Sequence, residues 1–174
     1  GDVYKRQVLY DVALTEAMPI ALTVQSLCNG IAHVASAAST ASLDGAARTE
    51  AFAAAGQALR AIEDLLLAPR DRRARERALR AASACASAFD RGTAGVQHKL
   101  AHAIGGTTGV DHAALHATLL PQFLAYLRSA NPDVLADLER AVDRPELDSY
   151  VHDLLARAGA PVSPDALAIK PEIM

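Results

Sequence analysis

Apolar residues recur every three or four positions through most of the chain, which is the spacing of one face of a helix. This spacing predicts helices over residues 23–38, 44–67, 72–89 and 146–158, and two more within 95–121. The expected N-caps are Thr23, Asp44, Asp71 and Asp111. Gly105 is expected to end a helix in a left-handed conformation. The first helix carries almost no charge, which indicates that it is buried.

The start of the chain has a different character. Residues 1–7 join abruptly to the rest, lack an initiator Met, and are interpreted as a non-native leader. The apolar run 8–10 predicts a short N-terminal strand or an extended start of the domain, and it cannot form a sheet alone. Alanine, the best helix former, supplies 39 of the 174 residues, and aromatic residues only 4%. The predicted fold class is therefore all-α, a helical bundle domain with one core.

Charge and composition exclude several classes of partner. The formal net charge of −3 gives no general attraction to nucleic acid or to anionic membrane surfaces. The arginine-rich run 70–77 has no interleaved aromatic residues and is interpreted as a solvated helix face. Cys28 and Cys85 form neither a disulfide framework nor a zinc motif, and no apolar run is long enough to span a membrane. These features predict a cytoplasmic protein that acts on a small molecule.

Three pairs of polar residues have the i,i+4 spacing that puts both members on one helix face. The pairs are Asn29 and His33, His98 and His102, and His112 and His116. Burying several imidazoles costs free energy unless partners satisfy them, so three pairs favour a site over simple packing. Lys99 stands where a zinc protease motif needs glutamate, and the glycine-rich run 105–109 lacks the lysine of a phosphate-binding loop.

This order of segments resembles the C-terminal helical domain of the iron-containing alcohol dehydrogenase family, and within it the maleylacetate reductase branch. The segments that carry the resemblance are 8–11, 13–15, 29–33, 98–102, 103–107, 112–116 and 119–121. The resemblance implies that residues 8–174 form the helical domain that meets substrate and metal. It also implies that the family's N-terminal dinucleotide-binding α/β domain is absent from this chain, and that chemistry occurs in the cleft between the two domains.

The resemblance also bears on metal binding. By position, the ligands of the metal-using members correspond to Asn29, His33, His98 and His112. The amide oxygen of Asn29 is a weaker ligand for Fe²⁺ or Zn²⁺ than the carboxylate of those members. Members of the maleylacetate reductase branch resemble this chain in having asparagine there and are regarded as working without a bound metal. No tight site for a divalent metal is therefore expected.

The resemblance implies an oxidoreductase that uses NADH or NADPH, bound mainly by the absent domain. It would reduce the conjugated double bond of maleylacetate to give 3-oxoadipate in the degradation of aromatic compounds. Such a reaction needs a group that polarises the carbonyl and a proton donor, and histidine suits both roles. His98 and His102 are assigned to these roles in either order, and His102 also to the nicotinamide. His33 and His112 are assigned to the substrate.

Two further residues have roles that the sequence leaves open. Lys99 either attracts a substrate carboxylate or faces solvent, and His116 either contacts the substrate or hydrogen-bonds to His112 from behind. His152 in the tail is interpreted as an ordinary surface residue.

Two other functions compete with the reductase. One is a metal-dependent alcohol or polyol dehydrogenase of the same family, in which Asn29 tolerates the ion. The other is a stand-alone helical binding module without activity, because no dinucleotide-binding fingerprint occurs in the chain. A homodimer is suggested only by the resemblance.

Overall fold

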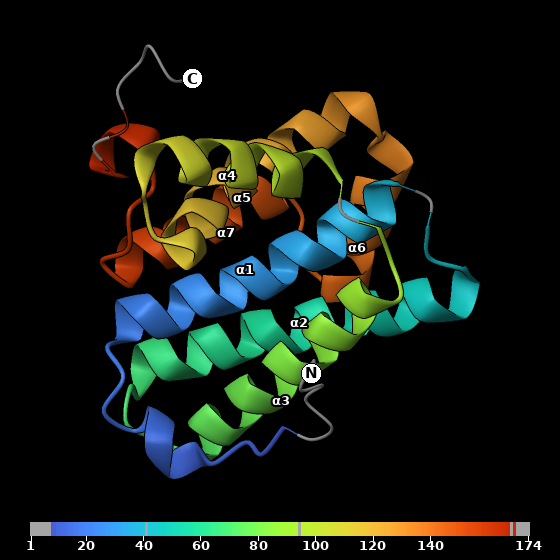
Figure 1. Ribbon diagram of the computed structural model, residues 1–174. Coiled ribbons are helices and arrows are strands. Elements are labelled where there is room, and N and C mark those ends of the chain that lie inside the picture. Colours follow the sequence, from blue (N-terminus) through green and yellow to red (C-terminus); the bar gives the residue numbers. More distant parts are fainter. Residues whose placement is uncertain (1–7, 41, 94, 168, 170–174) are drawn as a thin grey trace, which may run out of the picture.

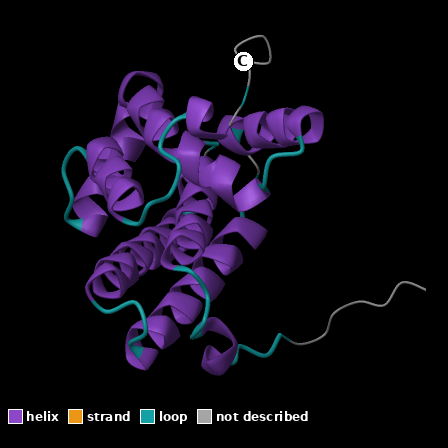
Figure 2. Cartoon of the chain, turned by 90° about the vertical axis from the view of Figure 1, so that its left-hand side faces the viewer, coloured by secondary structure: helices purple, strands orange, loops and turns teal. Residues whose placement is uncertain are grey.

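The computed structural model describes residues 8–40, 42–93, 95–167 and 169, so the predicted leader lies outside the described residues. The described chain is helical, with short loops and no strand (Figure 2). Its elements are η1 (Val12–Thr15), α1 (Ile20–Ser39), α2 (Gly45–Leu67), α3 (Arg72–Asp90), α4 (Val96–Thr108), α5 (His112–Ala130), α6 (Pro132–Val142), α7 (Leu147–Arg157) and η2 (Pro164–Leu167).

Of the two predictions for the start of the domain, the strand is wrong and the extended start fits the structure. Residues 8–11 have no regular secondary structure, and they lead into the short 3₁₀ helix η1. A single strand has no neighbour to satisfy its backbone groups, whereas the Asp11 side chain accepts a 2.9 Å hydrogen bond from the backbone N–H of Ala13. The segment therefore enters the bundle through a capped turn.

The helix α1 is the centre of the molecule. It runs through the middle of the bundle, with α2 and α3 on one side and α4, α5 and α7 on the other (Figure 1). Within the described residues, α1 is the one helix long and apolar enough to cross a membrane by length and composition. Its side chains at Val24, Cys28, Ile31 and Val34 have no exposed surface, which identifies α1 as a core helix. The cytoplasmic location stays a prediction.

Three of the predicted helix caps are confirmed. The side chains of Asp44, Asp71 and Asp111 each accept a hydrogen bond from the backbone N–H three residues later, at 2.8, 2.6 and 2.9 Å. These bonds satisfy donors that the first turn of a helix leaves unpaired. They also fix the starting points of α2, α3 and α5.

Two other boundaries differ from the prediction. The helix α1 begins at Ile20 rather than at Thr23, whose hydroxyl donates to the carbonyl of Pro19 at 3.1 Å instead of capping. Gly105 lies inside α4, and the left-handed residue is Gly109, with φ of 71°. The backbone N–H of Gly109 donates to the carbonyl of Gly105, so the helix continues one turn beyond the predicted end.

One arginine of the predicted solvated face is buried. The side chain of Arg75 is only 2% exposed. Its guanidinium donates to the backbone carbonyls of Pro69 and Met18 at 2.9 and 2.8 Å, and to the hydroxyl of Thr23 at 2.9 Å. Arg75 therefore ties the start of α3 to the start of α1, and burial lowers the pKa of its guanidinium.

The crossing from α3 to α4 lies very close to α1. The backbone N–H of Gly95 donates to the hydroxyl of Ser36 at 3.1 Å. A Cβ atom on Gly95 would lie 2.7 Å from that hydroxyl oxygen and 2.8 Å from the Ser36 carbonyl oxygen. A Cβ on Gly92 would lie 2.6 Å from the Cβ of Ala37. Only glycine permits this approach, which sets where α4 begins.

We predict that Gly95→Ala lowers the free energy of unfolding by about 1–3 kcal/mol, because the added methyl group overlaps buried atoms of α1. Urea unfolding followed by circular dichroism measures the effect. The matched control is Gly106→Ala in α4, where a Cβ meets nothing within 4 Å. That variant should gain about 0.5–1 kcal/mol from the better helix former, and equal effects of the two variants would contradict the argument.

Candidate functional site

Five of the six histidines come together on one side of α1. His33 is supplied by α1, His98 and His102 by α4, and His112 and His116 by α5. The ring centroids of neighbouring members lie between 4.3 and 6.2 Å apart. We call these five residues the histidine cluster. The convergence predicted from the i,i+4 spacing is confirmed.

Burial divides the histidine cluster into a floor and a rim. The side chain of His116 has no exposed surface, and those of His33 and His98 are partly buried. His102 and His112 are exposed. The cluster is therefore exposed to solvent at His102 and His112 and buried at His116 on α5.

The rim and the floor are joined by a pair of ring nitrogens. The Nε2 atoms of His98 and His102 lie 2.9 Å apart and share a hydrogen bond. When both rings are neutral, only one of the two atoms carries a hydrogen, and the other accepts. The pair is thus ready to pass a proton between a partly buried ring and an exposed one.

Sequence reasoning missed Gln97 and Phe89. Gln97 is 2% exposed and contacts His116 twice, with its Oε1 atom 3.1 Å from Nδ1 and its Nε2 atom 3.3 Å from the backbone carbonyl oxygen. The ring of Phe89 in α3 lies 4.3 Å from that of His33 between centroids. Neither residue is three or four positions from a histidine in the sequence. Their places beside the cluster follow from the packing of the helices, which the sequence pattern does not reveal.

Four buried side-chain atoms on α1, α4 and α5 have no hydrogen-bond partner in the described chain. They are Asn29 Oδ1, His33 Nδ1, His98 Nδ1 and His116 Nε2. Unpaired buried polar atoms are rare and cost free energy in a folded protein. Three of the four belong to rings of the histidine cluster, which indicates a site that binds polar groups. His116 has no hydrogen bond to His112, although their ring centroids are 4.3 Å apart.

Burial favours the neutral form of three histidines of the cluster. Loss of hydration, reinforced by the charges that neighbouring histidines would carry, lowers the pKa of His33 to about 4 and that of His116 to about 3. The same causes lower the pKa of His98. These three neutral imidazoles offer N–H donors and bare nitrogen acceptors without a fixed positive charge.

The remaining predicted site residues lie at the edge of the cluster or outside it. Asn29 is partly buried on α1, one turn before His33. Lys99 is exposed, as is His152 on α7, which is a surface residue as predicted. Among the described residues, no three histidine, cysteine, aspartate or glutamate side chains are arranged to share one metal ion.

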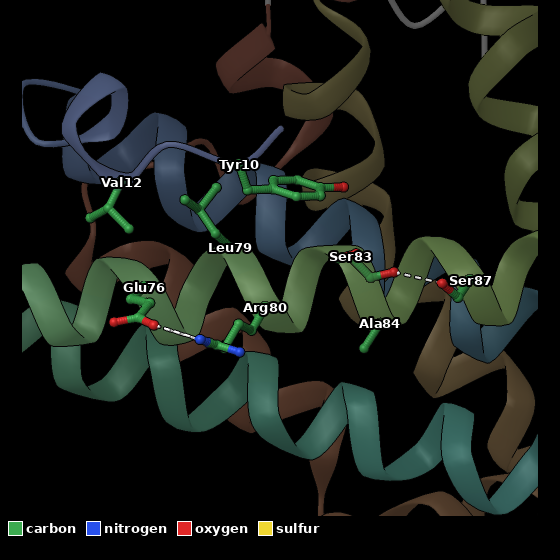
Figure 3. A pocket seen from close by; sticks show the side chains of 8 residues that line it. All are labelled: Tyr10, Val12, Glu76, Leu79, Arg80, Ser83, Ala84 and Ser87. Carbon is green, nitrogen blue, oxygen red and sulfur yellow. Dashed lines mark hydrogen bonds and ion pairs between the residues drawn. The ribbon is translucent and has the colours of Figure 1, made fainter. Parts of the chain in front are cut away.

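Among the hollows that lie outside the cluster, two are of interest. One, of about 550 Å³, lies between the N-terminal segment and α3, where Glu76 and Arg80 pair at 2.7 Å (Figure 3). This ion pair occupies the charged groups of that hollow, which contains no histidine. The other, of about 350 Å³, is an apolar groove along α4 and α5, lined by Val96, Gln97, Leu100, Leu119, Gln122, Phe123 and Tyr126. Gln97 therefore lies between this groove and His116.

A family model and curated protein sequences both match this chain. Residues 23–163 match the family model described as "Fe-containing alcohol dehydrogenase family, C-terminal". The chain is 33% identical over 168 residues to the maleylacetate reductase of Rhizobium sp. strain MTP-10005, covering 97% of this chain and 48% of that protein. The chain thus spans about half the length of the curated relatives it matches.

Solved structures give the same result. The maleylacetate reductase of Agrobacterium tumefaciens superposes with a TM-score of 0.81 at 34% identity, covering 94% of this chain and 46% of that one. The iron-containing alcohol dehydrogenase of Corynebacterium glutamicum superposes with a TM-score of 0.76 at 26% identity, covering 92% and 45%. Both cover most of the helical fold described above.

We predict that stability falls in mild acid. The unfolded chain takes up protons on its histidines near their ordinary pKa of about 6.5, whereas His33 and His116 resist protonation in the fold. The contribution of His33 and His116 to the free energy of unfolding is therefore fully present above about pH 6.5, and it is lost as the pH falls towards 4. Urea unfolding between these values measures it. His116→Gln should reduce the pH dependence and the surface variant His152→Gln should not. An unchanged slope in His116→Gln would refute this account.

Proposed function

Because the chain belongs to the iron-containing alcohol dehydrogenase family, we propose that it forms the helical half of an NAD(P)H-dependent maleylacetate reductase. The substrate class is an unsaturated oxo-dicarboxylate, and the product is the saturated oxo-acid. Identity of about one third with several maleylacetate reductases, over nearly the whole of this chain, supports the proposal. The homodimer implied by the resemblance stays a prediction.

The observation that carries the proposal is the histidine cluster with its unpaired buried atoms. A structural cluster would satisfy its nitrogens internally, whereas here three ring nitrogens of the cluster have no partner in the described chain. At the rim, the exposed rings of His102 and His112 leave N–H donors and acceptors accessible. An arrangement with a buried floor and an exposed rim fits a planar, conjugated substrate better than a structural role does.

NADH or NADPH, when bound, supplies a hydride to the conjugated double bond. The exposed rings at the rim fit a neighbouring planar ring, and the family resemblance assigns His102 to the nicotinamide. The chain's own residues then have two tasks. One N–H of the His98 and His102 pair stabilises the negative charge that develops on the carbonyl oxygen, and the other ring delivers the proton that completes the reduction.

The substrate carboxylates need donors or cations. His33 and His112 flank the pair and offer ring nitrogens that can donate N–H bonds. Lys99 in α4 is exposed and follows His98 directly in the chain. Its ammonium group can attract a substrate carboxylate that approaches from solvent. Ring N–H donors beside a peripheral cation fit a substrate that carries carboxylates.

We propose further that no tight metal takes part. The donor set does not fit one, because Asn29 offers a neutral amide oxygen and the Nε2 atom of His98 is engaged with His102. One observation favours the metal-dependent dehydrogenase as a second candidate. Asn29 Oδ1, His33 Nδ1 and His98 Nδ1 are each buried without a hydrogen-bond partner in the described chain, and a weakly bound cation could satisfy such atoms.

We expect Asn29→Asp to raise the affinity of the chain for Zn²⁺ by about tenfold or more, since a carboxylate is a stronger ligand than an amide. Isothermal titration calorimetry at neutral pH measures the change. Asn131→Asp, at the junction of α5 and α6, is the matched control and should have no effect. If the unmodified chain already binds Zn²⁺ as tightly as the variant, the metal-dependent candidate is favoured.

In a full-length enzyme that contains this chain, His102→Ala should lower kcat for maleylacetate by about 100-fold or more, because a proton donor or polarising N–H is lost. His152→Ala is the control and should keep the activity. The 174-residue chain alone should not consume NADH. A change confined to KM would assign His102 to substrate binding instead, and full activity of His102→Ala would overturn the mechanism.

A further inference from the structure

Gln97 makes two hydrogen bonds to one residue, and together they determine where the hydrogen lies on His116. The backbone carbonyl of His116 can only accept, so the amide nitrogen of Gln97 faces it, at 3.3 Å. The amide oxygen of Gln97 then faces Nδ1 of His116, at 3.1 Å. Because an amide oxygen can only accept, Nδ1 must carry a hydrogen.

This arrangement leaves the other nitrogen of His116 bare. The ring is neutral in the fold, so a hydrogen on Nδ1 means that Nε2 has only a lone pair. Nε2 is buried and has no partner within the described chain. Three rings of the cluster surround it, with centroids 4.3, 5.1 and 5.2 Å from that of His116, and they belong to His112, His98 and His33.

We propose that Gln97 is a positioning residue, which fixes His116 as the Nδ1–H tautomer so that its bare Nε2 atom presents a hydrogen-bond acceptor to the floor of the histidine cluster. The acceptor takes a neutral donor, either an imidazole N–H of the cluster or a water molecule. The importance of this acceptor for catalysis rests on the proposed reductase function. The tautomer of His116 does not, because it can be measured on this chain without any enzyme assay.

The hydrogen bonds of Gln97 distinguish a positioning role from a role in packing alone. Gln122 lines the same apolar groove but is exposed and has no hydrogen bond to a histidine. Gln97 is 2% exposed, and its amide has both of its hydrogen bonds on His116. A residue needed only for volume could be replaced by methionine, which has a similar length and is apolar. A residue that sets the tautomer could not.

The test is a long-range ¹H–¹⁵N correlation spectrum of the histidine rings in the uniformly ¹⁵N-labelled chain at neutral pH. The signals of His116 are identified by their loss in His116→Gln. The expected pattern shows Nδ1 protonated and Nε2 unprotonated in a single species. An Nε2–H ring, or a rapidly exchanging mixture of both tautomers, would overturn the proposal without any need for a variant.

Two variants test whether Gln97 is the cause. Gln97→Met should lose the single Nδ1–H pattern, because the hydrogen on Nδ1 would be buried without an acceptor. Gln122→Met, on the exposed side of the same groove, is the matched control and should keep the pattern. An unchanged pattern in a folded Gln97→Met chain would show that Gln97 does not set the tautomer. Failure of the reductase proposal would appear in the enzyme assay and would leave these spectra unchanged.

Discussion

The histidine cluster depends on how closely the crossing from α3 to α4 lies against α1. Gly92 and Gly95 leave no room for a Cβ atom above Ala37 and Ser36, so the chain passes within hydrogen-bond distance of the core helix. The helix α4 begins directly after this contact, and its position brings His98 over α1. A wider crossing would lift α4 away and separate its histidines from those of α1 and α5. The close contact of backbone to helix is therefore the constraint on which the site is built.

The fold maintains a costly arrangement at this point. Each unpaired buried polar atom costs about 1–3 kcal/mol, and three such ring nitrogens belong to the histidine cluster. Burial of apolar side chains elsewhere along α1 and α5, such as Ile31, Leu120 and Leu124, offsets this cost. Proteins retain such local costs mainly where a site needs them, because a fully satisfied network would have no capacity to bind anything else. The energetics and the proposed function therefore agree.

The sequence predicted six of the seven α-helices of the described residues, three caps and the convergence of the histidines, because these follow from spacing within single helices, whereas α6 was not predicted. It did not predict Arg75 or Gln97, whose burial depends on partners far along the chain. Backbone carbonyls at chain reversals satisfy Arg75, and no side-chain pattern reveals them. Gln97 is satisfied only where α4 meets the backbone of His116 in α5. The misplaced helix end at Gly105 has a related cause, since glycine inside a helix and glycine at its end look alike without the packing around them.

The neutral form of His98 has a consequence for a dianionic substrate, on the proposed function. Burial lowers the pKa of His98, so at neutral pH this ring seldom carries the second proton that would make it an imidazolium. A carboxylate or an enolate oxygen nearby would raise the pKa again, because opposite charges stabilise each other strongly where water is excluded. The hydrogen bond between His98 and the exposed ring of His102 gives the incoming proton a route from solvent. The negative charge of the substrate would thus create the acid that the reduction needs, and protonation would be confined to the moment when the double bond is reduced.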